Sequence, residues 1–226
     1  MKERPIIMSA PMVRALLEER KTQTRRVLNP QPSHDQYHVW RGRVTRDEEH
    51  RMWCWKDLAL ENIWDFPNGE DRKELALHCP YGVPGDRLWV REAFLIDDRT
   101  LITGPLPRVE PNLDWQDCTY YRADGECCEQ IPECACAEYD GKTPWRPSIF
   151  MPRWVSRITL EITDVRVQRL QEISEEDAIA EGYEVAFGPG MFSRAFDSFW
   201  DSINAKKHPW ASNPWVWAIT FRGVDS

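Results

Sequence analysis

The chain has 226 residues, 42% of them hydrophobic, and a formal net charge of −8. This composition, with twelve tryptophans, excludes a disordered protein, and the acidic balance excludes a general coating protein for nucleic acids. No stretch has the length of a signal peptide's apolar region or of a membrane span. We therefore expect a cytoplasmic protein without a membrane partner, whose seven cysteines are reduced thiols or metal ligands.

The first thirty residues predict a strand, a helix and a polar loop. Residues 5–8 are apolar and indicate the strand, Ser9 is a candidate helix cap, and Pro11 suits the first helical turn. The helix should bury four apolar residues that recur at helical spacing: Met12, Val13, Leu16 and Leu17.

Residues 20–26, which we expect to form a curled loop, gather an ammonium, two hydroxyls and three guanidiniums. Lys21 can act as a base or a point cation, and Thr22 or Thr24 can supply an attacking oxygen. Three guanidiniums can fork onto phosphate or carbonyl oxygens, those of Arg20, Arg25 and Arg26. A solvated basic helix end explains the same residues without a function, because cations are favoured near a helix C-terminus.

Two irregular stretches, at residues 31–77 and 99–144, are predicted to be insertions. Tryptophans in the first can pack on the core or stack on bases. The second holds a cysteine cluster that suggests a structural zinc, although its spacing is not the usual pair of C-x-x-C hooks; free thiols in a loop are the alternative. The candidate ligands are Cys127, Cys128, Cys134 and Cys136, with Cys118, Cys79 or His78 as supplements.

Residues 87–94 alternate in polarity and predict a strand. Glu92 falls on its apolar face, with Leu88, Val90 and Phe94. A buried carboxylate needs a partner, for which Lys21 or an arginine of the loop is a candidate. A strand-end glutamate that reaches solvent is the alternative.

The last third of the chain is regular. Alternation along residues 158–167 predicts a strand that slips phase near Thr163 and Asp164, as at a bulge. A capping box at residues 174–177 opens a short helix that Gly182 can end. Glu181 lies in the last turn, where the helix dipole disfavours an ionised acid, and this suits a proton carrier; an ordinary surface glutamate is the alternative.

A further helix and a closing strand follow. The helix is indicated by an apolar stripe of Phe192, Ala195, Phe196, Phe199, Trp200 and Ile203. The strand covers residues 215–221, with Trp215, Trp217, Ile219 and Phe221 on one face. Few helices among several strands predict an α+β fold with a curved, barrel-like sheet.

Three stretches together resemble the ASCH domain, a family of PUA-like β-barrels. The family signature G-x-K-x-x-E-x-R matches at Glu19, Lys21, Thr24 and Arg26, with glutamate in place of the glycine and threonine in place of the acid. A threonine at this second position is typical of the bacterial N4-acetylcytidine amidohydrolases, which are small ASCH enzymes. Residues 85–92 resemble the family's G-D-x-L-x-V strand.

The helix at residues 173–182 resembles the one on which these amidohydrolases carry their glutamate, which places Glu181 at the catalytic acid position. The whole chain also resembles ASCH-like proteins encoded by phages and prophages. The resemblance covers about residues 4–30, 78–98 and 145–224, and it implies one domain over residues 1–226 that carries the two insertions.

The resemblance implies hydrolysis of an N4-acylated cytidine, or action on another modified nucleoside or base, free or in RNA or DNA, without a catalytic cofactor. Thr24 would attack the amide carbonyl or orient a water, Lys21 would take the hydroxyl proton, and Glu181 would protonate the leaving nitrogen. The substrate-binding candidates are Arg20, Thr22, Arg25, Arg26 and Glu92. The acidic balance favours a small nucleoside over a long polymer. A non-catalytic module that holds a modified base, and a ribonuclease, are the other functions that fit these residues.

Overall fold

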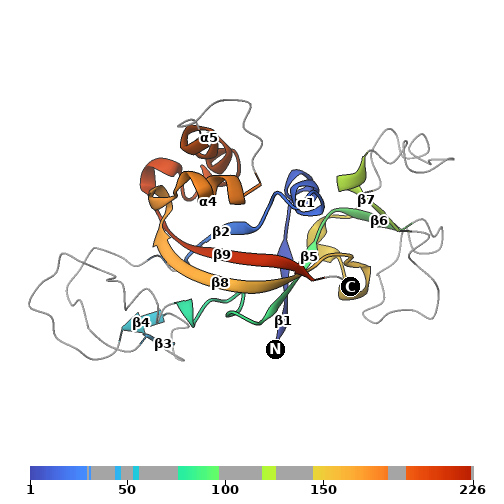
Figure 1. Ribbon diagram of the computed structural model, residues 1–226, viewed down its shortest axis with the longest axis horizontal. Helices are drawn as coiled ribbons and strands as arrows, with labels where there is room; N and C mark the ends of the chain where they lie inside the picture. Colours follow the sequence, from blue (N-terminus) through green and yellow to red (C-terminus); the bar gives the residue numbers. More distant parts are fainter. Residues whose placement is uncertain are drawn as a thin grey trace, which may run out of the picture. The chain divides into compact units, whose positions relative to one another are not determined.

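The computed structural model describes residues 1–29, 31, 44–46, 53–55, 76–96, 119–125, 145–182 and 192–224. Figure 1 shows their strands and helices, coloured along the chain from blue at the N-terminus to red at the C-terminus. The strands are β1 (Glu3–Ile7), β2 (Gln23–Val27), β3 (Val44–Arg46), β4 (Trp53–Trp55), β5 (Arg87–Arg91), β6 (Phe94–Ile96), β7 (Thr119–Tyr121), β8 (Thr159–Arg169) and β9 (Trp215–Val224). The α-helices are α1 (Ala10–Leu17), α4 (Glu175–Ala180) and α5 (Phe192–Asn204), and short 3-10 helices cover Arg122–Asp124, Ser148–Phe150, Arg153–Val155, Leu170–Glu172 and Trp210–Ser212.

A mixed five-stranded sheet, in the order β1-β5-β8-β9-β2, is the centre of the fold. β1 runs parallel to β5, whereas β5 is antiparallel to β8 and β2 is antiparallel to β9. Two further two-stranded ladders join β3 to β4 and β6 to β7. The predicted α+β class is confirmed. Within the described residues the sheet ends at β1 and β2 without closing, so the predicted barrel is not confirmed.

The chain divides into two compact units, and β8 and β9 contribute to both. Unit 1 comprises Met1–Thr22, Gly85–Ile162 and Phe221–Ser226, and unit 2 comprises Gln23–Pro84 and Thr163–Thr220. The boundary within β8 falls where two consecutive residues, Thr163 and Asp164, are both exposed, so the predicted phase slip is confirmed. The single domain over residues 1–226 stays a prediction.

In unit 1, α1 ends in a Schellman motif that sets the direction of the chain toward Lys21. The backbone N–H of Arg20 donates to the Ala15 carbonyl at 2.9 Å, and that of Glu19 donates to the Leu16 carbonyl at 3.0 Å. Glu19 has φ 57°, in the left-handed region that the motif requires and that glycine normally occupies. The chain therefore holds a strained glutamate where the ASCH signature has its glycine.

Two details of α1 differ from the prediction. Ser9 stands at the N-cap position, but its side chain accepts no capping hydrogen bond. The buried face includes Val13 and Ala15, whereas Leu17 is 49% exposed. Because successive helical residues rotate by about 100°, a face centred between Met12 and Leu16 leaves Leu17 at its margin.

The strand predicted over residues 87–94 is divided into β5 and β6, with Glu92 and Ala93 between them. Asp86 precedes β5 and links it to β1, because its carboxylate accepts from the Lys2 backbone N–H at 2.7 Å and from Arg4 at 2.8 Å. Gly85, with φ 89°, supplies the turn before it. Beyond β5, an apolar cluster of unit 1 is formed by Phe94, Ile96, Met151 and Val155.

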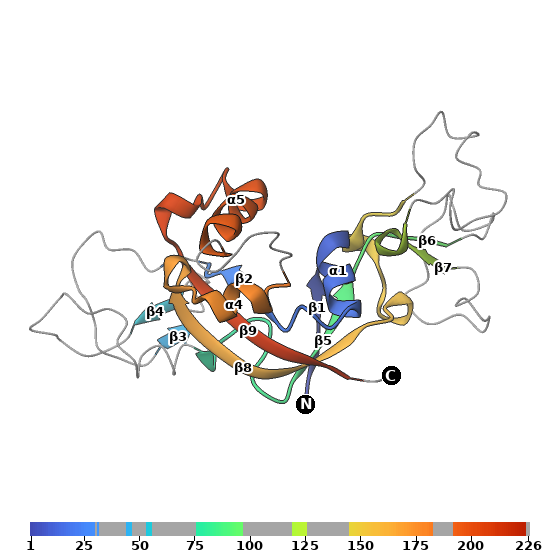
Figure 2. The ribbon, with the colours of Figure 1, turned by 45° about the horizontal axis from the view of Figure 1, so that its top comes forward.

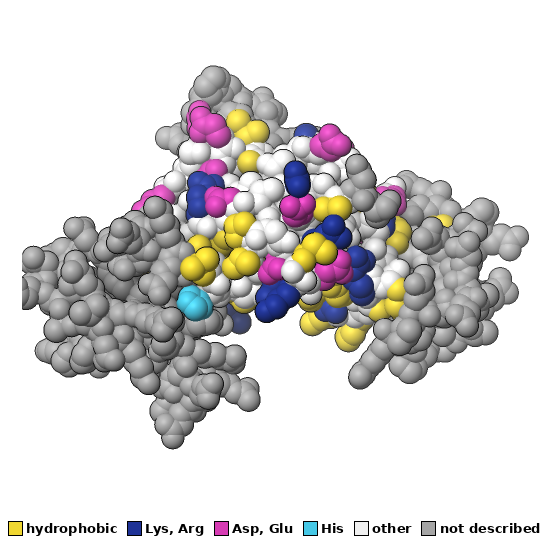
Figure 3. All heavy atoms as spheres, turned by 60° about the horizontal axis from the view of Figure 1, so that its bottom comes forward, with side chains coloured by type: hydrophobic (Ala, Val, Ile, Leu, Met, Phe, Trp, Pro, Cys, Tyr) yellow, Lys and Arg dark blue, Asp and Glu magenta, His cyan; other side chains and the backbone are white. Residues whose placement is uncertain are grey.

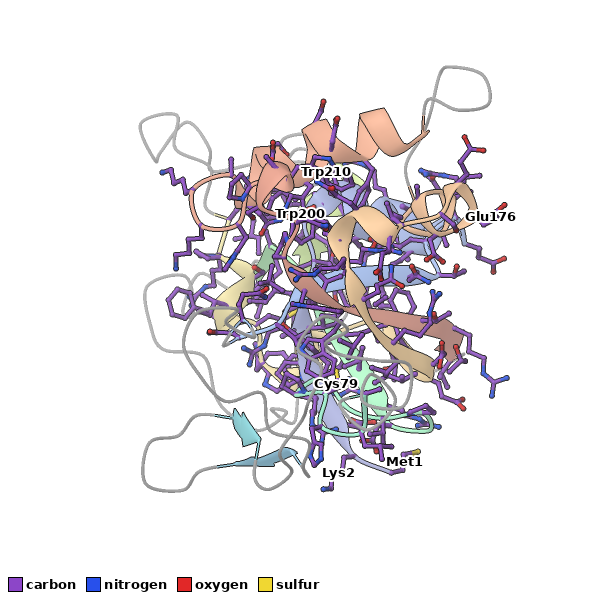
Figure 4. All side chains as sticks on the ribbon, turned by 90° about the vertical axis from the view of Figure 1, so that its left-hand side faces the viewer. Met1, Lys2, Cys79, Glu176, Trp200 and Trp210 are labelled. Carbon is purple, nitrogen blue, oxygen red and sulfur yellow. The ribbon has the colours of Figure 1, made fainter. Side chains whose placement is uncertain are left out.

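In unit 2, α4 and α5 lie together beside β2 and β9, as Figures 1 and 2 both show. The core here is a cluster of Leu170, Phe196, Trp200 and Val216, against which Trp210 packs. Figure 4 shows Trp200 and Trp210 close together under α5. Ile203, predicted to share the buried stripe, is 55% exposed because it lies in the last turn of α5, beyond this cluster. The side chains predicted at Phe192 and Ala195 lie outside the described residues.

β9 is buried on both faces rather than on the one predicted. Trp215, Trp217 and Ile219 alternate with Val216 and Ala218, and all five are buried. Helix α5 covers Val216 through the cluster of unit 2, which accounts for the second buried face. Of the two predicted insertions, the structure describes only short pieces, so their packing stays a prediction.

Replacing Glu19 by glycine should stabilise the protein. Relief of the left-handed strain contributes about 1–2 kcal/mol, and the extra freedom of glycine in the unfolded chain offsets about 0.4–1 kcal/mol of it. We expect a net gain of about 0.5–1 kcal/mol in the free energy of unfolding, measured by urea denaturation. The matched control is Glu18→Gly, because Glu18 has φ −88° and should lose stability. A loss of stability in Glu19→Gly would contradict the strain argument.

Candidate functional site

Most of the predicted catalytic loop is a strand. Only Arg20, Lys21 and Thr22 precede β2, which pairs with β9 from Gln23 beside Thr220 to Val27 beside Val216. The loop prediction is therefore wrong from Gln23 onward, because β9 supplies hydrogen-bonding partners for this polar segment. The pairing gives the segment a fixed alternation of side chains.

Buried polar side chains are concentrated in this segment. Among the described residues, eight polar or charged side chains are buried, and five of them are Lys21, Gln23, Thr24, Arg25 and Glu181. Lys21 is 2% exposed, Thr24 1% and Glu181 5%. Burial of such groups is unfavourable unless they are paired, so each of them needs a partner within the protein. Four of the five lie in the segment, and Glu181 lies at the end of α4.

The other predicted binding residues of this segment are less buried. Thr22 is exposed, whereas Arg20 and Arg26 are partly buried. Arg20 forms a salt bridge with Glu18, two residues before it. Exposed pairs of this kind contribute little to stability.

The two faces of β2 have different surroundings. Because side chains alternate along a strand, Gln23 and Arg25 project to one face and Thr24 to the other. The face of Gln23 and Arg25 meets α4, where both side chains contact Asp177. Thr24 therefore lies on the opposite side of β2 from the contacts with α4.

The Arg25 guanidinium joins β2 to α4. Its Nη2 donates to Asp177 Oδ2 at 2.7 Å, and its Nη1 donates to Gln23 Oε1 at 2.7 Å and to Glu181 Oε1 at 3.1 Å. The guanidinium carbon also lies 5.9 Å from the centre of the Phe196 ring on α5. A buried guanidinium with two carboxylate partners is a strong, directional contact.

Asp177 is a shared acceptor in this network. Besides Arg25, it accepts from Arg166 Nη2 at 3.0 and 3.3 Å and from Gln23 Nε2 at 3.1 Å. Burial alone would raise the pKa of Asp177, but the hydrogen bond from Arg166 and the charge of Arg25, with help from Gln23, hold this pKa below its ordinary value. Its backbone N–H donates to the Ser174 side chain, so the predicted cap at Ser174 is confirmed.

Glu181 stands at the C-cap of α4, directly before Gly182, whose φ of 82° ends the helix as predicted. The alternative of a surface glutamate is wrong, because Glu181 is buried and forms a salt bridge with Arg25.

Sequence reasoning missed two members of the network. Arg166 lies on β8, and its polar neighbours gave no sign that it faces the Asp177 carboxylate. Gln23 lies inside the polar segment at residues 20–26, but an amide is neither a nucleophile nor a base, so nothing in the sequence predicted a functional role for it. A strand assignment for residues 23–27 would have grouped Gln23 with Arg25, because residues two apart share a face.

Glu92 belongs to a different cluster, in unit 1. It is buried as predicted, and its partner is Arg157, whose Nε and Nη2 donate to the two Glu92 oxygens at 3.0 and 3.2 Å. Arg157 also donates to both Asp124 oxygens, at 2.7 and 2.8 Å. The alternative of a solvated Glu92 is wrong, and the sequence did not point to Arg157 as its partner.

Tyr121 completes this second cluster. The Arg157 guanidinium carbon lies 3.9 Å from the centre of its ring, and the hydroxyl donates to the Val155 carbonyl at 2.7 Å. Burial raises the pKa of Tyr121 to about 12 despite the nearby charge of Arg157. The cluster thus ties β7 and the 3-10 helix Arg122–Asp124 to Arg157, just before β8, and to Glu92, just after β5, and its contacts stabilise the fold.

The predicted zinc ligands Cys127, Cys128, Cys134 and Cys136 lie outside the described residues, so the zinc stays a prediction. In the part of the chain that the structure describes, His, Cys, Asp and Glu form no group of three suited to a metal ion. Across the same residues, the helices are too short or too polar to span a membrane. Cys79 is buried and is not part of a disulfide.

No family model, curated protein or solved structure matches the chain. The link to the ASCH family therefore rests on the motif resemblance alone.

Arg157→Met should destabilise the protein by about 3 kcal/mol at neutral pH, because it leaves the Glu92 carboxylate buried and unpaired. The double variant Arg157→Met/Glu92→Gln should recover most of this loss, since no buried charge remains. Urea denaturation of both variants and the wild type measures the difference. Equal stability of the single and double variants would contradict the role assigned to Glu92.

The loss in Arg157→Met should also depend on pH. Burial already raises the pKa of Glu92 above its ordinary value of 4.5, although Arg157 opposes it, and removal of Arg157 raises this pKa further. The folded state then binds the proton more tightly than the unfolded state. The stability that this proton binding gives to the folded variant is fully present below pH 4.5 and is lost as the pH rises through the raised pKa of Glu92. The gap between variant and wild type should therefore widen from pH 4.5 toward neutrality in urea denaturation.

Proposed function

We propose that this chain is an ASCH-like hydrolase that removes the acyl group from an N4-acylated cytidine or a related acylated base. The observation that carries the proposal is the contact between β2 and α4. The resemblance places candidate catalytic residues on these two segments, and Arg25 joins the face of β2 that it shares with Gln23 to Asp177 and Glu181 on α4. Thr24 projects from the other face of β2. Segments that share one chemical task are expected to meet in this way.

The backbone at Glu19 gives independent support. The ASCH signature begins with glycine two residues before its lysine, and here the residue in that position has a φ of 57°. The left-handed conformation is the physical reason for a glycine at this point. The chain keeps the conformation although it has lost the glycine, as expected of a divergent member of such a family.

In the proposed reaction the hydroxyl oxygen of Thr24 adds to the amide carbonyl of the acylated base, and the bond from the carbonyl carbon to N4 breaks. Lys21 takes the proton that leaves the hydroxyl, and this proton passes through Glu181 to N4 as the amine departs. Water then hydrolyses the ester on Thr24 and releases the carboxylic acid. A water oriented by Thr24 and attacking directly gives the same products.

The salt bridge to Arg25 refines the role of Glu181. Arg25 holds the Glu181 carboxylate at 3.1 Å, and Glu181 relays to N4 the proton that Lys21 takes from the hydroxyl. Arg26, which is partly buried, is the candidate for holding the carbonyl oxygen. Arg25 is unsuited to that task, since both of its terminal nitrogens already donate to protein groups.

The charge distribution is consistent with a small substrate. On the described part of the face in Figure 3, basic and acidic side chains are interspersed. With a net charge of −8, such a surface offers weak attraction to a long polyanion. A nucleoside or a single modified base meets less repulsion.

The proposal is tested by incubating the protein with N4-acetylcytidine and related acylated nucleosides and following the products by liquid chromatography and mass spectrometry. We expect the wild type to release cytidine, and Lys21→Ala to lose about 100-fold or more in kcat/KM. Thr24→Val should lose activity similarly, whereas Thr24→Ser should retain part of it because serine keeps the hydroxyl. The control is Lys207→Ala, an exposed lysine beyond α5, which should leave the rate unchanged.

Absence of turnover by the wild type across the panel would overturn the hydrolase. Calorimetric binding of the same nucleosides without turnover would then identify a non-catalytic reader of modified bases. Cleavage of an RNA oligonucleotide that depends on Lys21 would identify a ribonuclease instead.

A further inference from the structure

Arg25 forms ion pairs with two residues on one face of α4. Asp177 and Glu181 are four residues apart, a spacing that places their side chains one above the other along a helix. Each terminal nitrogen of the guanidinium donates to one of them. Arg25 is itself buried, so its orientation is fixed by these partners and not by solvent.

The two carboxylates hold Arg25 unequally. The contact to Asp177 is 2.7 Å and the contact to Glu181 is 3.1 Å. Gln23 donates to Asp177 while it accepts from Arg25, and Arg166 approaches Asp177 from β8. The charge of Arg25 is therefore matched mainly at Asp177, and the longer contact to Glu181 chiefly sets direction.

We infer that Arg25 is a positioning residue for Glu181 and not a clamp for substrate phosphate, and that Asp177, held by Arg166 and Gln23, fixes Arg25 in this role. The inference rests on the proposed function, and it revises the sequence prediction that Arg25 binds substrate. It also narrows the substrate class. A guanidinium whose terminal nitrogens already donate to Asp177, Gln23 and Glu181 gives no added affinity to a phosphate, so an acylated nucleoside is as good a substrate as its 5′-monophosphate at this position.

Asp177 is needed for a physical reason. Without its carboxylate, the buried charge of Arg25 would be compensated at Glu181, and the 3.1 Å contact would tighten. A Glu181 carboxylate drawn toward Arg25 in this way would change its orientation. The network therefore fixes the orientation of Glu181 through Arg25.

The kinetic test uses N4-acetylcytidine and its 5′-monophosphate with Arg25→Met and Asp177→Asn. Positioning predicts that both variants lose about 10–100-fold in kcat on both substrates, with KM changed by less than about 2-fold. Asp177→Glu, which restores the charge, should recover part of the loss. The control Arg222→Met removes a well-exposed arginine that pairs with Glu161 in unit 1, and it should leave both constants unchanged. A rise in KM for the monophosphate alone in Arg25→Met would show a phosphate clamp and overturn the inference.

A second measurement keeps the inference testable if the hydrolase proposal fails. In protein labelled with ¹³C at the glutamate carboxyl carbons, the Glu181 signal is identified by its loss in Glu181→Gln. Positioning predicts that the chemical shift of this signal changes in both Arg25→Met and Asp177→Asn, whether or not the wild type turns over any substrate. An unchanged signal in the two folded variants would overturn the inference. If Arg25→Met does not fold, the near-isosteric Asp177→Asn and the partly exposed Arg166→Met provide the same comparison.

Discussion

A charged guanidinium inside a protein needs carboxylates beside its nitrogens. Arg25 is buried in unit 2, so α4 must place its carboxylates next to β2. The condition fixes which face of α4 meets β2, and it makes the short helix useful although six residues make fewer than two turns. Ser174 starts the helix and Gly182 ends it, so that Asp177 and Glu181 present their carboxylates one turn apart. The site thus depends on the residues that start and end α4 more than on the length of this short helix.

Unit 1 follows the same rule with the roles reversed. There the carboxylate of Glu92 is the buried group, and Arg157 reaches it from a less buried position. Arg157 divides its donors between Glu92 and Asp124 much as Arg25 divides its donors between Asp177 and Glu181. The surroundings differ: in unit 1 the Tyr121 ring packs on the Arg157 guanidinium, whereas in unit 2 Arg25 lies near the Phe196 ring and binds two acids of one helix.

The sequence revealed features that local patterns determine and missed those that depend on distant partners. The helix cap at Ser174 and the phase slip at Thr163 are local, and both were found. β2 was missed because its polar residues show no apolar alternation, and its partner Thr220 lies 197 residues away along the chain from Gln23. The partners Arg157 and Arg166 could not be chosen among 29 lysines and arginines without the fold.

Burial of both faces of β9 has a consequence for handling the protein. From Trp215 to Phe221 the strand has no charged residue, and six of its seven residues are apolar. Such a segment has the composition that favours assembly between chains once it is exposed. Pro214 before it and Arg222 after it are residues that oppose such assembly at the ends of an apolar strand. Heating a concentrated sample past its unfolding temperature should therefore yield precipitate rather than chains that refold on cooling.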